Sequence, residues 1–369
     1  MAQRRTLLTA LGAWPLAQLA RAQTLPATPI ATGSAGGARA GIHPWMEVGN
    51  SVVADVMVDG KVVAQLDHQS KLPGLKKPPA LVFALPAGLQ RLRLRGKVTI
   101  SGKTSPFDKT WKVRDMAPFS APLYDQGKPW IERVRALSKK LEEGSLAVQP
   151  AKPVPGKKPA NAALQDLEKR LGAPLPAMFK LLADWDIQVG DSYFLAPARM
   201  STVTEMLMGE WDYTRDGKNG LDKLLSRAVR ARYDRSLAVF VEVGDGLGAL
   251  AWDPAGVTPG EPPNTWGDKG NPGAQPGTPN QGVWYWLHQE TLNEPALLLD
   301  DNYRPKTAEA ALTHVLQRFA LNDVDSPESD NELVVDTAYP RANLLQLHFD
   351  EPRKPRLWLR SYDHHYSLY

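Results

Sequence analysis

The alternation of apolar and polar residues is clearest in the segment LAVFVEVGDGLGALAWDP, residues 237–254. Two apolar runs flank a Gly-Asp-Gly turn at 244–246. An Asp-Gly turn between apolar runs is a strong hairpin signal, because glycine accepts the positive φ that the turn requires. Alternation puts Phe240 and Glu242 on the same face of the first strand. We therefore expect a β-hairpin at the centre of the second half of the chain, with most of both faces covered.

Short apolar stretches at strand spacing also dominate residues 45–120. Turns such as Asp59-Gly60 separate them, and this spacing predicts a small, all-β, sandwich-like domain. Arginines alternate along residues 89–95, where they form either a binding stripe or the solvated outer face of a strand, which is the commoner case. We expect strands at 51–58, 61–66, 80–85, 89–94, 98–100 and 110–113.

Two connecting segments follow. Apolar residues recur at helical spacing over 130–141, which predicts a connecting helix within residues 121–145. The next segment, QPAKPVPGKKP, contains four prolines and three lysines. Proline lacks the N–H that helices and central strands use, so we predict a Pro/Lys linker and a domain boundary at 146–160.

A second domain is expected at 161–322, and its pattern mixes helices with strands, which indicates the α+β class. A C-terminal β extension, 323–369, follows an acidic stretch, and the sequence leaves open whether its strands extend the second domain's sheet or dock elsewhere. Helices are expected at 161–171, 175–185, 200–210, 221–232 and 308–321, and strands at 191–195, 282–287, 333–335, 344–349 and 357–359.

Residues 1–22 have the layout of a secretory signal peptide. Arg4-Arg5 precede a mildly apolar run, and Ala20-Arg21-Ala22 offers small residues at the positions that a signal peptidase reads. The paired arginines resemble a twin-arginine export signal, and an ordinary Sec signal is the alternative. Cleavage after about Ala22 would place the protein in the periplasm or outside the cell, with a flexible leader at 23–44.

Composition narrows the possible functions. Removing residues 1–22 lowers the net charge from +4 to +1, with 41 basic against 40 acidic residues, which argues against a nucleic-acid partner. No later stretch is long and apolar enough for a membrane span. The chain has no cysteine, hence no disulfide, thiol nucleophile or thiolate metal site. We predict no cofactor and no metal, since the adjacent His364 and His365 would point to opposite sides of a strand.

Residues 160–321 carry an ordered set of motifs: Leu164, Leu167, Glu168, Leu171 and Gly172, then Leu175-Pro176, Gly244-Asp245-Gly246-Leu247-Gly248, Trp252-Asp253, Gly282-Val283-Trp284-Tyr285 and a final helix. In this order they resemble the SUKH superfamily, named partly after a yeast regulator of cell-wall assembly and killer-toxin resistance. This resemblance implies an α+β domain with a mixed sheet and packed helices. It also implies a binding role, because bacterial members are mostly immunity proteins that neutralise toxins, and it implies no shared catalytic residues.

Several residues are candidates for contact with a partner, because aromatic side chains are frequent anchors of protein interfaces and sugar platforms. For the aromatic strand, burial on both faces is an equally good interpretation, and the two aspartates are more typical of turns and caps. The candidates are Trp211, Trp266, Trp284, Tyr285, Trp286, Asp245 and Asp253.

Glu205, Glu210 and Asp212 lie near aromatic residues, and paired carboxylates are the make-up of a glycoside-cleaving site. Solvated acids near a helix end are commoner, so no catalytic residues are assigned. The sequence therefore predicts an exported, non-enzymatic, protein-binding module, whose partner would be a toxin acting in the periplasm. The alternatives are a cell-envelope protein that binds glycan or peptidoglycan and, less favoured, a glycoside hydrolase.

Overall fold

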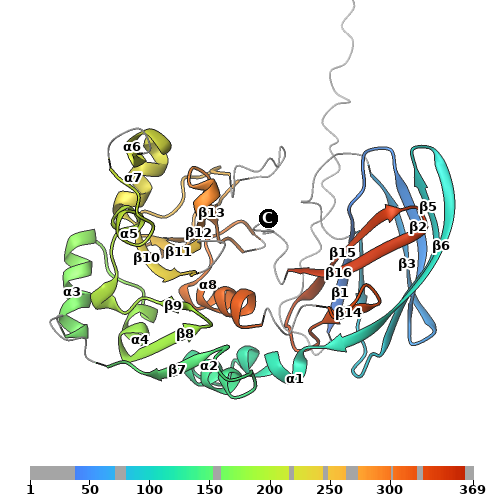
Figure 1. Cartoon of the computed structure of the whole chain (residues 1–369), viewed down its shortest axis with the longest axis horizontal. Coiled ribbons are helices and arrows are strands. Elements are labelled where there is room, and N and C mark those ends of the chain that lie inside the picture. The colour runs from blue at the N-terminus through green and yellow to red at the C-terminus, as the bar shows by residue number, and fades with distance from the viewer. Residues whose placement is uncertain are drawn as a thin grey trace, which may run out of the picture. The chain divides into compact units, whose positions relative to one another are not determined.

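The computed structural model describes residues 38–70, 80–152, 159–215, 220–243, 248–262, 273–300, 302–321 and 327–361, which belong to one unit of the chain, Gly37–Tyr369. These residues form helices and three β-sheets, so the fold is mixed α+β as predicted (Figure 1). The predicted signal peptide, the turn 244–246 with Asp245, Trp266 and the terminal histidines lie outside the described residues. Among the described helices, none has the length and apolar character that crossing a bilayer requires.

Two of the sheets share one apolar core. The first has five strands in the order β14-β6-β5-β2-β3, and the second has four in the order β16-β15-β1-β4. Ile42, Val56, Trp111 and Leu347 are fully buried in the core between them. The strands are β1 (Arg39–Pro44), β2 (Ser51–Val58), β3 (Lys61–Gln69), β4 (Leu81–Ala84), β5 (Arg91–Ile100), β6 (Lys103–Asp115), β14 (Glu332–Val335), β15 (Ala342–Glu351) and β16 (Lys354–Ser361).

The C-terminal strands complete these two sheets, which answers the question that the sequence left open. Strand β14 pairs in parallel with β6, and β15 pairs in parallel with β1, so blue β1 lies beside red β15 (Figure 1). Strand β1 also corrects the prediction of a flexible leader up to residue 44. Ala40 and Ile42 alternate into the core, and the strand is held on one side by a partner 300 residues further along the chain, which no local pattern reveals.

The third sheet has seven strands in the order β13-β12-β11-β10-β9-β8-β7. Its edge strand β7 comes from the predicted Pro/Lys linker, which therefore contributes to the sheet. An edge position tolerates Pro150, because no further strand needs its missing N–H. The strands are β7 (Ala147–Pro150), β8 (Trp185–Val189), β9 (Ser192–Phe194), β10 (Leu237–Val241), β11 (Gly248–Asp253), β12 (Val283–His288) and β13 (Ala296–Leu297).

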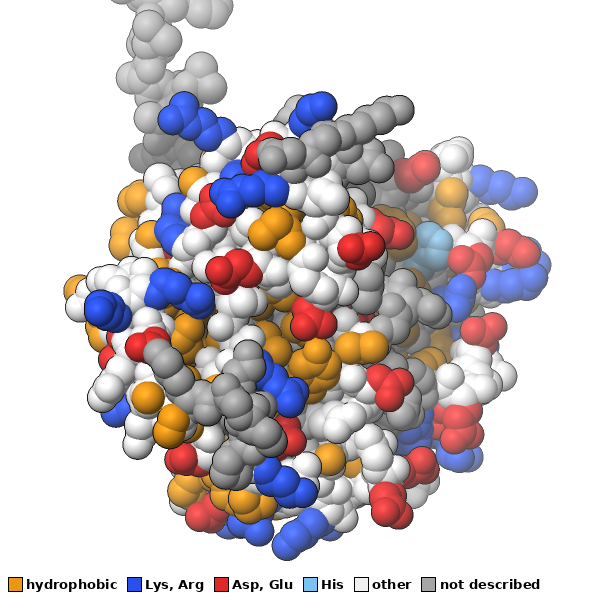
Figure 2. All heavy atoms as spheres, turned by 60° about the vertical axis from the view of Figure 1, so that its left-hand side comes forward, with side chains coloured by type: hydrophobic (Ala, Val, Ile, Leu, Met, Phe, Trp, Pro, Cys, Tyr) orange, Lys and Arg blue, Asp and Glu red, His pale blue; other side chains and the backbone are white. Residues whose placement is uncertain are grey.

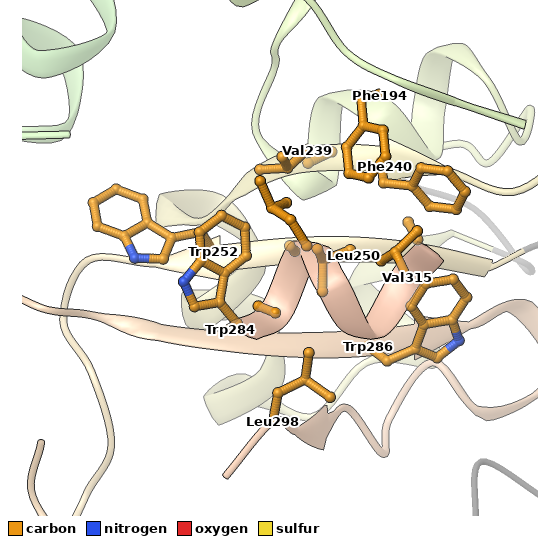
Figure 3. Packing of buried hydrophobic residues seen from close by; sticks show 14 of the residues in the cluster. Phe194, Val239, Phe240, Leu250, Trp252, Trp284, Trp286, Leu298 and Val315 are labelled. Atoms are coloured by element: carbon orange, nitrogen blue, oxygen red, sulfur yellow. The ribbon is translucent and has the colours of Figure 1, made fainter. Parts of the chain in front are cut away.

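The predicted hairpin is confirmed, because β10 and β11 pair antiparallel and every residue of both strands is buried. On one face of the sheet, Phe179 packs against Trp252 and Trp284, with ring centroids 5.5 and 5.9 Å away. Helix α8 covers the same face (Figure 3). On the opposite face Tyr233 stacks on Tyr285 at 6.0 Å. The aromatic strand β12 is thus buried on both sides.

The helices follow the predicted positions with three differences, of which the first is the short helix α1, which was not predicted. Helix α3 ends at Gly172, whose φ of 65° is the left-handed conformation that glycine favours. The single helix expected at 221–232 is two helices, because Ser226 caps the second one through Val229 N–H at 3.3 Å. The last helix ends in a π-helical turn. The helices are α1 (Ala117–Ser120), α2 (Trp130–Ser138), α3 (Ala160–Leu171), α4 (Met178–Asp184), α5 (Val203–Gly209), α6 (Leu221–Leu224), α7 (Arg227–Arg235), α8 (Ala308–Val315) and the π-turn η5 (Leu316–Ala320).

Candidate functional site

A line of four residues crosses the seven-stranded sheet at the end where β10 runs toward β11. Gly248 lies opposite His288 of β12, and Glu242 N–H donates to the Gly248 carbonyl at 2.8 Å. Since β9 and β10 are antiparallel, Ser192 is the neighbour of Glu242 on the other side. We call this line the hairpin-end row; it consists of Ser192, Glu242, Gly248 and His288.

Aromatic side chains pack next to the hairpin-end row, on the same face of the sheet. Trp286, two residues before His288 and on the same face, stacks on Phe319 of η5 at 5.4 Å and lies 6.2 Å from Phe240. Figure 3 shows Trp286 and Phe240 at one end of the sheet, next to helix α8. Arg318 places its guanidinium 5.0 Å from the centre of the Trp286 ring, within cation–π distance.

Gly248 allows two side chains to close over β11. A Cβ atom at this position would lie 2.4 Å from Glu242 Oε2 and 2.4 Å from Trp286 Cζ2, closer than any carbon tolerates. Only glycine therefore permits the carboxylate and the indole to approach each other across the strand.

Glu242 is the electrostatically unusual member of the hairpin-end row. Its side chain is half-buried, and no described residue donates a hydrogen bond to its Oε2, which is shielded from solvent. Burial raises the pKa of Glu242 because it disfavours the charged form, while the positive charge of Arg318 acts in the opposite direction. The indole Nε1 of Trp286 is also buried without an acceptor among the described residues. Within the described part of the chain, an indole donor and a carboxylate acceptor thus lie near each other without partners.

The geometry of the hairpin-end row suits binding rather than covalent catalysis. Ser192 Oγ accepts a hydrogen bond from Val243 N–H at 3.0 Å, and His288 Nδ1 accepts one from Glu290 N–H at 3.2 Å. Ser192 and His288 are three strand spacings apart, about 14 Å, which is too far for a nucleophile and its base. Among the described residues, no three His, Asp or Glu side chains converge as a metal site would require.

The predicted aromatic anchors occupy the core. Trp284 and Tyr285 are fully buried, and Trp286 and Trp211 are 2% and 7% exposed. An interface anchor must be reachable by its partner, so the structure favours the other interpretation, a strand covered on both faces. Trp266 and Asp245 lie outside the described residues.

Asp253 is fully buried at the end of β11, on the face opposite the hairpin-end row. Its carboxylate accepts hydrogen bonds from Arg232 Nε at 3.0 Å, from Arg235 Nε and Nη2 at 2.8 and 2.7 Å, and from Ala255 N–H at 2.9 Å. Arg232 also binds Glu261, at 2.5 Å. Internal groups therefore satisfy Asp253, and its bond to Ala255 is the turn interaction that the sequence favoured.

The three carboxylates of the suggested hydrolase site occupy different structural positions around helix α5. Glu205 forms a capping box with Thr202 at the start of α5, so its carboxylate is held by backbone N–H. Glu210 caps the other end of the same helix, and Asp212 follows with a φ of 55°. An open cavity of about 340 Å³ lies nearby, but it is lined by Tyr213, Leu224 and residues 289–294. The structure therefore does not bring Glu205, Glu210 and Asp212 together around a cavity.

Comparisons of the chain with protein-family models, with curated proteins and with solved structures found no significant match. The arguments about function therefore depend on the geometry and chemistry of this chain. The strand alternation had placed Glu242 beside Phe240, but Ser192 and His288 join the row through strand register, for which the sequence carries no signal.

Proposed function

We propose that the chain is an exported, non-enzymatic binding protein that receives a protein partner at the hairpin-end row. The observation that carries this proposal is the half-buried Glu242 carboxylate, whose Oε2 receives no hydrogen bond from the residues that the structure describes. Burying an unsatisfied carboxylate destabilises a fold, by about 1–3 kcal/mol for an unpaired polar group. Such a residue is explained if a partner supplies the missing donor, and sites of this kind are frequently functional.

The chemistry of the site defines the group that would bind. A lysine or arginine side chain of the partner would pair with the Glu242 carboxylate after this half-buried side chain turns outward, and its aliphatic stem would lie against Val243, which is 46% exposed. On the face shown in Figure 2, acidic and basic side chains are interspersed rather than gathered by sign, which suits a protein partner better than a polyanion.

Two features of the sequence indicate which class of protein would be the partner. The resemblance of residues 160–321 to the SUKH superfamily and the signal-like residues 1–22 support a toxin that acts in the periplasm. In this proposal the chain covers the working surface of the toxin, and no reaction takes place on the chain itself.

The test is calorimetric titration of the purified chain, without residues 1–22, against the toxin-like product of the neighbouring gene. We expect a one-to-one complex, and Glu242→Gln should weaken it about tenfold, because a charge-assisted hydrogen bond becomes a neutral one. Glu143→Gln, at an exposed glutamate of the loop after α2, serves as the matched control and should bind like the wild type.

The pH dependence adds a second readout. Because burial raises the pKa of Glu242, a cationic partner should lose affinity on acidification at a higher pH than an ordinary glutamate would dictate. The Glu242→Gln variant should lack this dependence. Absence of a complex would refute the protein-binding function, and equal affinities of the wild type and Glu242→Gln would refute the assignment of the site.

A further inference from the structure

A second constellation lies on the outer face of the four-stranded sheet, far along the chain from the hairpin-end row. Trp45 directly follows β1, and its N–H donates to the Leu347 carbonyl at 2.8 Å, so Trp45 continues the strand beside His348. His348 in turn lies opposite Arg356 of β16. Side chains from three strands thus meet at one level of the sheet. We call Trp45, His348, Asp350 and Arg356 the Trp45 platform.

Trp45 is the exposed member of the Trp45 platform. It is 49% exposed, whereas most tryptophans of a folded protein are largely buried. One side of its ring contacts the His348 imidazole, with centroids 5.2 Å apart and planes tilted by 41°. The imidazole contact orients the indole, and the exposed part of the ring presents a flat apolar surface.

Polar groups with remaining hydrogen-bonding capacity surround this indole. His348 Nε2 lies 3.4 Å from Asp350 Oδ1, and Arg356 Nη1 lies 3.7 Å from Asp350 Oδ2. The second distance exceeds that of a hydrogen bond, and the Arg356 and Asp350 side chains are 55% and 48% exposed. His348 Nδ1 is buried and has no hydrogen-bond partner among the described residues. Donors and acceptors therefore lie at the edge of an aromatic surface.

A second aromatic residue extends the same face. Trp358 lies two residues along β16 from Arg356, opposite Gln346 of β15. It is partly buried, and the Arg356 guanidinium lies 6.0 Å from the centre of its ring. Gln346 is only 5% exposed, so the accessible part of this face is at the level of Trp45 and Arg356, and Trp358 packs beside it.

We propose that the Trp45 platform binds an uncharged hexose unit of a polysaccharide, which stacks on Trp45 and hydrogen-bonds to the exposed side chains of Asp350 and Arg356, while His348 orients the indole. The apolar C–H face of a pyranose ring matches a flat indole, and its hydroxyls both donate and accept, as the mixed polar rim requires. The platform has one permanent cation, Arg356, near the carboxylates of Asp350 and Asp330, so it offers no net attraction for an acidic polymer. A protein interface would surround the indole with an apolar core, whereas here the neighbours across the sheet are polar.

The test is co-sedimentation of the chain, without residues 1–22, with insoluble chitin, with cellulose and with isolated peptidoglycan. We expect retention by at least one of the three, and about tenfold weaker retention for Trp45→Ala. Trp45→Phe should bind with intermediate strength because it keeps a flat ring. Because binding would depend on stacking and neutral hydrogen bonds, it should change less than twofold between 0.05 and 0.5 M salt, roughly the range over which surface charges become screened.

Val48 provides the matched control. It is 54% exposed and lies three residues from Trp45, so Val48→Ala trims a neighbouring exposed apolar side chain without touching the ring. We expect Val48→Ala to bind like the wild type, and circular dichroism should show that both variants are folded. The proposal is overturned if none of the three polysaccharides retains the protein, if Trp45→Ala binds unchanged, or if Val48→Ala weakens binding as much as Trp45→Ala. Loss of binding at high salt would indicate attraction to an acidic polymer and would also overturn it.

Discussion

The buried carboxylate of Asp253 provides the sharpest test of what holds the seven-stranded sheet to its helices. Asp253 ends β11 and accepts hydrogen bonds from Arg232 and Arg235, which both belong to α7. We consider the substitution Asp253→Asn, which preserves the shape of the side chain and removes its charge. The asparagine oxygen can still accept hydrogen bonds from one side of the site. The asparagine NH₂ group, however, would face an arginine guanidinium, and both groups can only donate.

The size of the effect follows from the exposure of the two arginines. The Arg235 side chain is 41% exposed and can turn to water, so it loses little. The Arg232 side chain is only 10% exposed and retains a single carboxylate, that of Glu261. Removing one partner of a buried ion pair costs about 3–5 kcal/mol. Because Glu261 still pairs with Arg232 in the variant, we expect a loss at the lower end of this range, about 3 kcal/mol. With an unfolding entropy of about 2.1 cal/mol/K per residue over roughly 330 residues, Tm should fall by about 4 °C.

The assay is thermal unfolding followed by circular dichroism, with urea unfolding as a second measurement. Asp222→Asn is the matched control, because Asp222 also pairs with an arginine of α7, Arg230, but its side chain is 47% exposed. An exposed pair contributes about 1 kcal/mol or less, so this variant should melt near the wild type. If Asp253→Asn melts within 1 °C of the wild type, or if the two variants lose equal stability, burial is not what makes the Asp253 pairing strong.

Two further predictions concern stability. Gly248→Ala should destabilise the fold by about 2 kcal/mol in a urea titration, because the new Cβ displaces the Glu242 carboxylate and the packed Trp286 ring. The control is Gly209→Ala in α5, where a Cβ meets no atom within 4 Å and no stability should be lost. Burial raises the pKa of Asp336 above its ordinary 3.8, although Ser120 and other groups donate hydrogen bonds to it. The charged form of Asp336 is therefore disfavoured in the folded state. Its contribution to the free energy of unfolding falls as pH rises. The Tm of Asp336→Asn relative to the wild type should therefore increase from pH 4.5 to pH 7.5, and a decrease would contradict this sign.

Local signals in the sequence predicted those elements whose evidence lies within a few residues. The hairpin of β10 and β11 follows from two apolar runs and a glycine-containing turn, and α3 ends at the expected Gly172. Strand β1 was missed because its parallel partner is about 300 residues away. The linker prolines hid β7, since an edge strand tolerates proline and a central strand does not.

The candidate site was only partly predictable, for a related reason. Alternation places Glu242 on the face of Phe240, but only strand register adds Gly248 and His288 to the row. The aromatic run of β12 illustrates the converse, because a short apolar strand has the same pattern whether one face or both are covered. Burial of Tyr285 by α7 depends on a helix that is distant in sequence, so exposure could not be derived from the pattern.

The parallel pairing of β1 with β15 has a consequence for biosynthesis. During synthesis, β1 emerges roughly 300 residues before its parallel partner β15, so this edge of β1 stays unpaired until residues 342–351 have been made. The open backbone edges would attract other extended chains during that interval. Fragments that end before residue 342 should therefore aggregate when expressed, unless a chaperone covers the unpaired edge.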